Sequence, residues 1–496
     1  MTDGHHAEIE RKYAVGEAAV VPDLAQVPGV AEARPVAAAH LEAVYFDTAD
    51  RVLARARIAL RRRRGGHDSG WHVKLPAAVG RTEVHGEIDE RSPDTPPPAV
   101  LDAVRSRVRD AALEPIARIE TTRTAVLLVD ATGTERVEFA DDVVRATDVA
   151  RGVLRAWREW EAEQVGDAPA VSARLLDALE PVLLSAGARP SVSPSKLAQA
   201  LGETGDEEPP AASTAGEAVR RLIAAQVEQL HRDAFALQHG GAEAVHGMRK
   251  TVRRLRALLA LDDVVGPAGR RLRDRLRLVG ATLGDARDAT VAAATAAALL
   301  DALPATVPGI DAARRRLVDS ADERAAEAQR RAVAAFRADA HLDLLADLDA
   351  FARTLPSGPD ALEPPDLLPR LATAAVGRAA RRSRHLDESL SALHDARKAA
   401  KRARYLIESL DDAGLLSRGS SLRRLARRAE RVHDAIGRHR DLALLVDELP
   451  FVSQRAAADG ENAYVYGVVA ERGGRELDRL RARIDRAVAK LAAAAR

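Results

Sequence analysis

Two glutamates and a lysine occupy alternate positions near the N-terminus, in the stretch Glu8-Ile9-Glu10-Arg11-Lys12. On a β-strand, side chains alternate between the two faces, so Glu8, Glu10 and Lys12 point the same way at intervals of about 7 Å. Such a row is poorly suited to a hydrophobic core. It suits a polar tunnel, in which carboxylates hold a hard cation and an ammonium group meets an anion. An exposed strand face with mixed charges is the alternative for this motif taken alone.

Charged residues share one face in several later segments of the first two hundred residues. The rows are Arg61 with Arg63, His72 with Lys74, Glu83 with His85 and Glu87, and Glu159 with Glu161 and Glu163. An ordinary half-exposed sheet alternates apolar and polar residues, and charges on one strand need no explanation. Charges of both signs on one face of successive strands favour a closed sheet with a polar interior.

Glycine and proline turn signals at 65–66, 76, 80, 133 and 152 delimit the strands of this sheet. A short helical segment near Val21–Val30 follows the opening strand. The later strands are expected at His40–Asp47, Arg57–Arg64, Gly70–Pro76, Arg81–Ile88, Ile116–Val129, Arg136–Val144 and Leu154–Gln164.

The overall composition describes a multidomain globular protein. A chain of 496 residues is too long for one ordinary core, and it contains 46% hydrophobic and 30% charged residues. The absence of cysteine excludes disulfides and thiolate metal sites. The chain shows no apolar run of membrane-spanning length and no signal-peptide pattern, so we expect a cytoplasmic protein with no membrane partner. An aromatic content of 3% argues against stacking on single-stranded nucleic acid.

The character of the sequence changes after a segment of linker composition, Gly202–Gly216. We therefore expect domains at 1–203 and 214–496, joined by a linker at 204–213. Ala/Leu/Arg-rich segments with helical spacing fill the second domain and predict a helical bundle or a pair of bundles. Interruptions are expected near Gly266, Pro304–Gly309, Pro356–Pro369 and Gly414–Gly419.

The helical half repeats a basic pattern. His246-x2-Arg249-Lys250-x2-Arg253-Arg254 recurs as His394-x2-Arg397-Lys398-x2-Lys401-Arg402. Spacings of three, four and seven place most of these residues on one stripe of each helix. Like charges clustered on a helix are destabilising unless an anion meets them. The alternative is a solvated basic face.

Each basic segment is followed by two further shared features. The first is an arginine-rich helix, at Arg270–Arg277 and Arg423–Arg431. The second is the motif Gly284-x2-Arg287-Asp288, matched by Gly437-x2-Arg440-Asp441. The Arg–Asp pairs either orient the basic helices or cap them, and the sequence leaves both interpretations open.

The first two hundred residues resemble the CYTH domain of the triphosphate tunnel metalloenzymes. The resemblance rests on the ordered set Glu8-x-Glu10-x-Lys12, Tyr45-Phe46-Asp47-Thr48, Leu60-Arg61-x-Arg63, Lys74-Leu75-Pro76, Arg81-x-Glu83, Glu159-x-Glu161 and Ser195-Lys196. That family includes class IV adenylate cyclases, thiamine triphosphatases and inorganic triphosphatases. The resemblance implies an eight-stranded antiparallel β tunnel that holds a triphosphate end to end.

The same resemblance implies roles for individual residues. The metal-binding acids, for Mg²⁺ or Mn²⁺, are Glu8, Glu10, Glu159 and Glu161. The phosphate-binding residues are Lys12, Arg61, Arg63, Lys74, Arg123 and Lys196. Glu83 and Asp141 complete the catalytic set, and the adjacent Asp142 leaves the register of the second acid open. One departure is His85, which stands where many members have a glutamate, and it puts the level of activity and the metal preference in question.

Residues 214–490 resemble the CHAD domain, a helical module that commonly follows CYTH on one chain. This resemblance implies that a basic groove between two pseudo-symmetric helical halves binds inorganic polyphosphate. The residues implied are His246, Arg249, Lys250, Arg253, Arg254, His394, Arg397, Lys398, Lys401, Arg402, Arg424 and Arg428.

These observations together predict an α+β multidomain protein that hydrolyses a triphosphate, inorganic tripolyphosphate in the first instance, and binds polyphosphate through its helices. Association with polyphosphate granules follows as an expectation. A non-catalytic polyphosphate-binding protein and an adenylate cyclase are the alternatives, and nucleic-acid binding ranks last.

Overall fold

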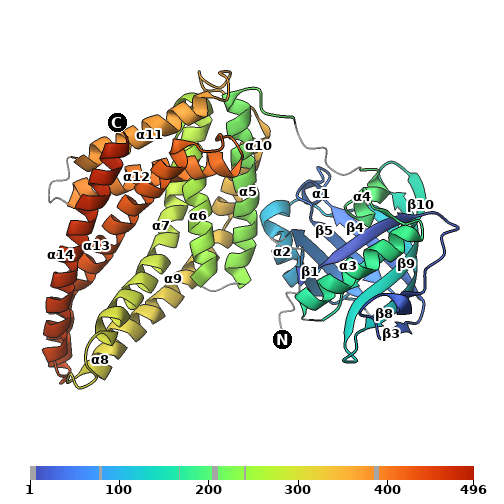
Figure 1. The fold of residues 1–496 in the computed structure, drawn as a ribbon, viewed down its shortest axis with the longest axis horizontal. Coiled ribbons are helices and arrows are strands. Elements are labelled where there is room, and N and C mark those ends of the chain that lie inside the picture. Colours follow the sequence, from blue (N-terminus) through green and yellow to red (C-terminus); the bar gives the residue numbers. More distant parts are fainter. Residues whose placement is uncertain are drawn as a thin grey trace. The chain divides into compact units, whose positions relative to one another are not determined.

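The chain forms two units that divide between Pro210 and Ala211 in a computed structural model (Figure 1). The structure describes residues 7–66, 68–76, 81–166, 168–203, 210–239, 242–384 and 390–495. The division lies within the expected linker at 204–213, of which residues 204–209 lie outside the described residues.

An antiparallel sheet forms the N-terminal unit. Its strands are β1 (Ala7–Glu8), β2 (Glu10–Val15), β3 (Glu32–Pro35), β4 (Ala39–Asp47), β5 (Ala59–Arg64), β6 (Gly70–Pro76), β7 (Arg81–Gly86), β8 (Glu114–Val129), β9 (Glu135–Asp148), β10 (Val153–Gln164) and β11 (Arg189–Pro190). Its helical segments are η1 (Leu24–Gln26), α1 (Val52–Arg55), α2 (Pro98–Val108), α3 (Pro169–Ser185) and α4 (Lys196–Leu201).

The sheet closes on itself through the first strand. Its order is β1-β7-β6-β5-β4-β8-β9-β10-β2, with β11 beyond β2 and β3 paired to β8. Only Ile9 separates β1 from β2, so the two ends of the order are one continuous stretch of chain. Counted this way, the described residues form a cycle of eight antiparallel strands, which confirms the expected tunnel.

Alternation along the strands gives the tunnel wall an apolar outside and a charged inside. On the outside, Tyr13, Phe139 and Trp160 are buried in one hydrophobic cluster with Leu176 and Leu179 of α3. The helix thus covers β2, β9 and β10 and leaves the opposite face of these strands to polar residues. Helix α4 contacts β8 and β9, and its residues share a second cluster with residues of β4.

Helices make up the described part of the second unit. They are α5 (Ala215–His239), α6 (Ala242–Leu258), α7 (Asp262–Asp301), α8 (Ile310–Arg314), the π-helical turn η2 (Arg315–Asp319), α9 (Ser320–Arg337), α10 (Asp339–Arg353), α11 (Leu367–Arg384), α12 (Leu390–Asp412), α13 (Ser421–Ala458) and α14 (Tyr464–Ala494).

The helical unit has two halves with the same order of contacts. In the first half, α5 packs on α6, α6 on α7 and α7 on α9; in the second, α11 packs on α12, α12 on α13 and α13 on α14. Across the junction, α6 contacts α12 and α7 contacts α13. The two basic helices expected from the repeat, α6 and α12, are therefore neighbours.

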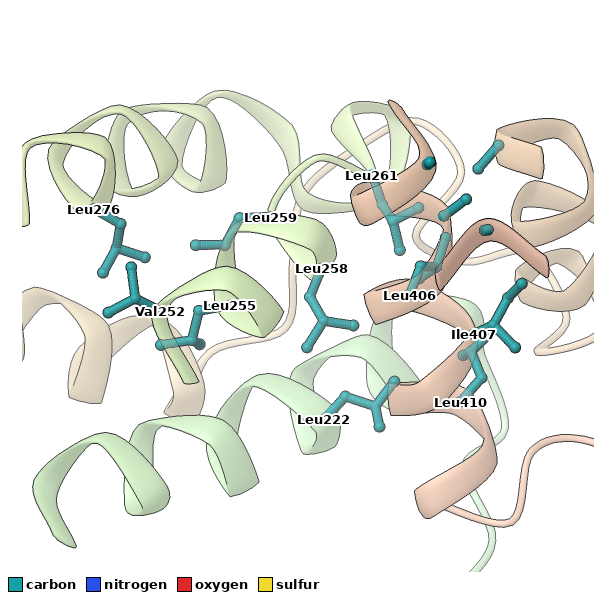
Figure 2. Close-up of a cluster of buried hydrophobic side chains, with 14 of the residues drawn as sticks. Leu222, Val252, Leu255, Leu258, Leu259, Leu261, Leu276, Leu406, Ile407 and Leu410 are labelled. Carbon is teal, nitrogen blue, oxygen red and sulfur yellow. The ribbon is translucent and has the colours of Figure 1, made fainter. Parts of the chain in front are cut away.

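Both halves contribute to one hydrophobic core (Figure 2). Leu258 and Leu261 of the first half lie in the same cluster as Leu406 and Leu410 of α12. Full burial of a leucine side chain stabilises a fold by about 1.5–3 kcal/mol, so this apolar seam holds the halves together and fixes α6 against α12. The opposite faces of the same helices carry the basic residues.

The expected interruptions fall at helix boundaries or kinks. Gly266 has a positive φ of 68° and kinks α7 near its start. The other three fall where α7 gives way to α8, α10 to α11 and α12 to α13. Within the described residues, every helix is too short or too polar to cross a membrane.

Candidate functional site

The inner face of the closed sheet surrounds a charged cavity of ≈ 90 Å³. Its charged lining residues are Glu10, Lys12, Arg61, Arg63, Lys74, Arg123, Glu161, Glu163 and Lys196. All of these except Glu163 belong to the set expected from the sequence. Tyr45, Thr121 and Ser195 also line the cavity. Glu163 belongs to the charged row that strand alternation identified in the sequence, but it was not included among the expected site residues.

Strand register brings three buried carboxylates together. Glu159 lies opposite Asp142 in the β9–β10 pair, and Glu161 follows two residues later on the same face. Oxygen atoms of Asp142, Glu159 and Glu161 lie within 4.8 Å of one another. Their exposed fractions are 0% for Asp142, 3% for Glu159 and 7% for Glu161. The cluster is a set of hard oxygen donors, which is the set that Mg²⁺ and Mn²⁺ prefer.

The acidic position on β9 is Asp142 and not Asp141. The two residues are adjacent on a strand, so they face opposite sides. Asp142 is fully buried within the cluster, while Asp141 accepts two hydrogen bonds from Arg158, of 2.8 and 2.7 Å, on the other face. Of the two neighbours between which the sequence left the register open, the structure therefore places Asp142, and not Asp141, beside the inner acids.

Lysines neutralise the carboxylate cluster. Lys196 Nζ lies 2.6 Å from Glu159 Oε1, 2.7 Å from Glu161 Oε1 and 2.9 Å from Asp142 Oδ2. Burial alone would lower the pKa of Lys196, but the three carboxylates raise it above its usual value. Lys12 Nζ lies 2.7 Å from Glu161 Oε1, and its pKa is likewise raised against burial by Glu161.

The local fold explains how Lys196 reaches the cavity. Ser195 is the N-cap of α4 and accepts a hydrogen bond from the backbone N–H of Ala198. This cap fixes the start of the short helix, so the next residue, Lys196, begins the helix and lines the cavity. The serine–lysine pair thus has one member that positions the helix and one that enters the tunnel.

Arg123 bridges the acids from the neighbouring strand β8. It donates two hydrogen bonds to Asp142, of 2.8 and 2.7 Å, and one of 2.7 Å to Glu161. Burial would lower the pKa of Arg123, but Asp142 and Glu161 raise it above its usual value. Arg123 therefore carries its charge in the cavity at every physiological pH.

Strands β5, β6 and β7 form a basic part of the wall around one carboxylate. Glu83 lies 3.9 Å from both Arg61 and Lys74, and its Oε1 lies 2.8 Å from Nδ1 of His72. Burial opposes ionisation of Glu83, but His72 and Lys74 lower its pKa to about 2. Burial, Arg61 and Arg123 lower the pKa of Arg63 to about 10. The wall thus gathers cations that repel one another, as a phosphate-binding surface does.

Glu10 and Glu8 are the remaining metal ligands expected from the sequence. Glu10 lines the cavity, and its carboxylate lies 3.1 Å from Lys12 Nζ. The backbone of Glu8 belongs to β1 and pairs with Arg81, but the side chain of Glu8 lies outside the described part of the structure.

The helical unit gathers cations where α6 meets α12. Burial, followed by Arg253, Arg397, Arg249 and Arg256, lowers the pKa of Lys401 to about 6. Burial and Arg253 lower the pKa of Arg249 to about 10. Cations of the first repeat therefore lie close enough to those of the second to lower their pKa across the junction. Such a cluster is held together by the apolar core beneath it and favours any anion that reaches it.

Small residues make room for the two central arginines. A Cβ at Gly284 of α7 would lie 3.7 Å from Arg249 Nη1, and a Cβ at Gly437 of α13 would lie 3.2 Å from Arg397 Nη2. These are the glycines of the repeated Gly-x2-Arg-Asp motif. They let each basic helix lie close to the long helix that follows it.

The Arg–Asp pairs of that motif lie beside the cluster and do not cap helices. Both lie in helix interiors, within α7 and α13, so the capping interpretation is wrong. Arg440 of the second half lies 3.7 Å from Asp288 of the first. Asp441 raises the pKa of Arg397 against the larger effect of burial, which lowers it. One partly exposed ion pair of the motif thus spans the two halves beside the basic helices.

Not every basic residue of the repeat faces this cluster. Arg254 lies 2.9 Å from Asp412 and 3.6 Å from Glu408 of α12. Arg402 lies near a different group of cations, because the charges that lower its pKa, after burial, are those of Arg273 and Arg382. Arg428 donates a 3.4 Å hydrogen bond to the backbone of Lys490, and Arg424 is exposed on the same helix. The exposed residues of the basic segments are His246, Lys250, His394, Lys398 and Arg402.

Comparisons with known proteins match both units. The CYTH domain model matches residues 6–163, and the CHAD domain model matches residues 221–450. An uncharacterised protein from each of two Mycobacterium tuberculosis strains is 34% identical over 519 residues, covering 99% of this chain and 97% of the relative.

Two solved structures resemble part of the chain. The CHAD domain from the plant Ricinus communis is 24% identical, with a TM-score of 0.43, over 55% of this chain and 92% of that chain. PptA from Streptomyces chartreusis is 21% identical, with a TM-score of 0.46, over 55% of this chain and 99% of that chain. On the family matches and the full-length relatives, the chain belongs to the proteins in which a CYTH domain is followed by a CHAD domain.

Proposed function

We propose that the tunnel hydrolyses inorganic tripolyphosphate with Mg²⁺ or Mn²⁺, and that the basic junction of the helical unit binds longer inorganic polyphosphate. The observation that carries this proposal is the buried Asp142–Glu159–Glu161 cluster, whose member Glu161 lines the same cavity as several arginines and lysines. CYTH domains bind triphosphates and CHAD domains associate with polyphosphate, so the chemistry of both units supports phosphate chains as the ligand.

A substrate that enters the tunnel must replace the carboxylates in its internal ion pairs. Lys196, Lys12 and Arg123 are all paired with carboxylates. A triphosphate competes for these cations, and a divalent ion competes for the carboxylates they release. Each of these two exchanges lowers the desolvation free energy that the other must overcome, because a buried charge left without a partner costs several kcal/mol. We therefore expect substrate and metal to bind cooperatively.

The metal ion fits the donor set on chemical grounds, since three buried carboxylates in contact range are typical ligands of a hard cation. Asp142, Glu159 and Glu161 would hold it together with Glu10. Bound there, it would neutralise charge on the phosphate oxygens.

The protein's own cations would position the chain and stabilise charge as it develops. Arginine presents a rigid fork that matches phosphate oxygens, and lysine supplies a point charge. Arg61, Arg63 and Lys74 line one wall of the cavity and Arg123 another. Positioning and electrostatics of this kind can supply most of the catalysis of phosphoryl transfer.

Phosphate release tests the proposal. The full-length protein is incubated with tripolyphosphate and either Mg²⁺ or Mn²⁺, beside Glu161→Gln and beside a Lys401→Met variant. We expect turnover by the wild type, its loss in Glu161→Gln, and its retention in Lys401→Met with weakened binding of long polyphosphate. If the wild type releases no phosphate but binds polyphosphate tightly, the protein is a binding protein. Formation of cyclic AMP from ATP would instead support the cyclase alternative.

A further inference from the structure

A second group of side chains of the types that ligate metals lies on the inner face of the sheet. Asp68 lies in the connection between β5 and β6, His72 in β6 and His85 in β7. His72 and His85 are direct partners in the β6–β7 register. One ligand atom from each of the three lies within 4.8 Å of the others, and the group is separate from the Asp142 cluster.

The spacing of the three atoms is that of ligands around a single ion. His85 Nε2 lies 2.9 Å from Asp68 Oδ1 and 3.2 Å from His72 Nε2. His72 Nε2 lies 3.6 Å from Asp68 Oδ1. Ligands about 2.1 Å from one ion, at angles between octahedral and tetrahedral, stand roughly 3.0–3.4 Å apart. The observed distances bracket this range without movement of the backbone.

Hydrogen bonding alone leaves this group with more acceptors than protons. His72 Nδ1 lies 2.8 Å from Glu83, so the ring proton belongs on Nδ1 and Nε2 is an acceptor. That Nε2 lies 3.1 Å from the backbone oxygen of Asp68, which is also an acceptor. His85 Nε2 has at most one proton to share between His72 and the Asp68 carboxylate.

The surroundings hold the three ligands in place. His72 has no exposed side-chain area, and its bond to Glu83 is the carboxylate–histidine contact that orients metal-ligating imidazoles. The other oxygen of Asp68 accepts a hydrogen bond from Arg63. Gly70 leaves the space that the His85 ring occupies, because a Cβ there would lie 3.0 Å from Cε1 of His85.

We propose that Asp68, His72 and His85 form a binding site for a divalent transition-metal ion of the Zn²⁺, Co²⁺ or Ni²⁺ type. Two imidazoles and one carboxylate suit these ions better than Mg²⁺, which prefers oxygen ligands. The ion ties Asp68 to strands β6 and β7, and through Asp68 it fixes Arg63 in the tunnel wall. His85 supplies the second imidazole of the site. The proposal stands independently of the hydrolysis proposed above.

Cobalt absorption tests the site directly on the full-length protein. Co²⁺ is titrated in excess Mg²⁺, which occupies oxygen-only sites, and the visible d–d absorption is recorded for wild type, His85→Ala and His40→Ala. His40 is a matched control, because it is 59% exposed in β4 with Glu42 3.8 Å away. Zn²⁺ affinity is measured by calorimetry on the same proteins.

We expect one equivalent of strongly absorbing Co²⁺ in the wild type and in His40→Ala. In His85→Ala, the band should be lost and the Zn²⁺ affinity reduced at least about 100-fold. His85 is half exposed, so its replacement should not prevent folding. The proposal is overturned if the wild type shows no such band, if the band survives in His85→Ala, or if Glu161→Gln rather than His85→Ala removes it.

Discussion

Asp141 and Asp142 are adjacent in β9, and each accepts two hydrogen bonds from an arginine, but on opposite faces of the sheet. Asp142 binds Arg123 inside the tunnel, and Asp141 binds Arg158 outside it. The chain therefore offers two substitutions of equal chemistry, each removing one carboxylate from a bidentate pair, of which only one touches the proposed active site.

Asp142→Asn should lower tripolyphosphate hydrolysis by about tenfold to 100-fold or more, because it removes a proposed metal ligand and the partner of Arg123 and Lys196. Asp141→Asn should change kcat and KM by less than about threefold. Phosphate release at saturating Mn²⁺ checks both, with melting temperatures to show that each variant is folded. Equal losses of activity in two folded variants would contradict the placement of Asp142 at the reacting centre.

A second pair of neighbours tests the basic junction. Arg253 lowers the pKa of both Lys401 and Arg397, whereas Arg254 forms an ion pair with Asp412. Arg253→Gln should weaken polyphosphate binding about tenfold or more, since a charge-assisted contact is worth about 1.5–3 kcal/mol. Arg254→Gln should weaken it by less than about threefold. Fluorescence anisotropy with labelled polyphosphate at one fixed salt concentration measures both, and a larger effect at Arg254 would move the binding surface to the other side of α6.

Polyphosphate binding should be linked to proton uptake by Lys401. In the free protein, the pKa of Lys401 is lowered to about 6 by burial and by the positive charges of Arg253, Arg397, Arg249 and Arg256. A polyanion favours the ammonium form and raises that pKa, so between pH 6 and the bound-state pKa the complex holds one more proton than the free protein. Affinity should therefore rise as the pH falls from 9 to 6, by at most about tenfold per unit, and level off below 6.

Calorimetry in buffers of different ionisation enthalpy counts those protons. His433 on α13 also faces this group, and burial lowers its pKa below the usual value. Lys401→Met should reduce the uptake at pH 8 by about one proton. Unchanged uptake in this variant would assign the linkage to another group.

The sequence predicted the tunnel strands closely because charge rows mark their faces: β6 was expected at Gly70–Pro76 and lies there. Alternation tells which residues of one strand share a face, but it does not align neighbouring strands. This is why Asp141 was chosen in place of Asp142, and why Arg123 could not be matched to its partners in advance. Helix α3 was missed, since its apolar face is recognisable only against the Tyr13–Trp160 surface that it covers.

Contacts between the two repeats could not be predicted from the sequence either. The repeat showed that α6 and α12 are equivalent, but it did not show that they touch, nor that Asp412 of one half pairs with Arg254 of the other. Asp68, which lies between strands, gave no periodic signal, so the Asp68–His72–His85 group emerged only from the β6–β7 register.

The two glycines of the repeated motif provide a graded test of how Arg397 is positioned. In Gly437→Ala the new methyl group lies 3.2 Å from Arg397 Nη2, so the guanidinium must move by a few tenths of an ångström. In Gly284→Ala the methyl lies at an ordinary contact distance of 3.7 Å from Arg249. Gly474→Ala on α14 meets nothing within 4 Å. Each change should also stabilise its helix by up to about 1 kcal/mol.

We expect polyphosphate affinity to fall several-fold in Gly437→Ala and to stay within about twofold of wild type in the other two variants. Because the substitution favours the helix while it displaces one arginine, Gly437→Ala should separate binding from stability: its melting temperature should not fall as its affinity does. A matching loss of affinity in Gly284→Ala would mean that the arginines tolerate no added methyl group on either long helix. Wild-type affinity in Gly437→Ala would show that Arg397 can shift without cost, and that its present position is not the one that binds the anion.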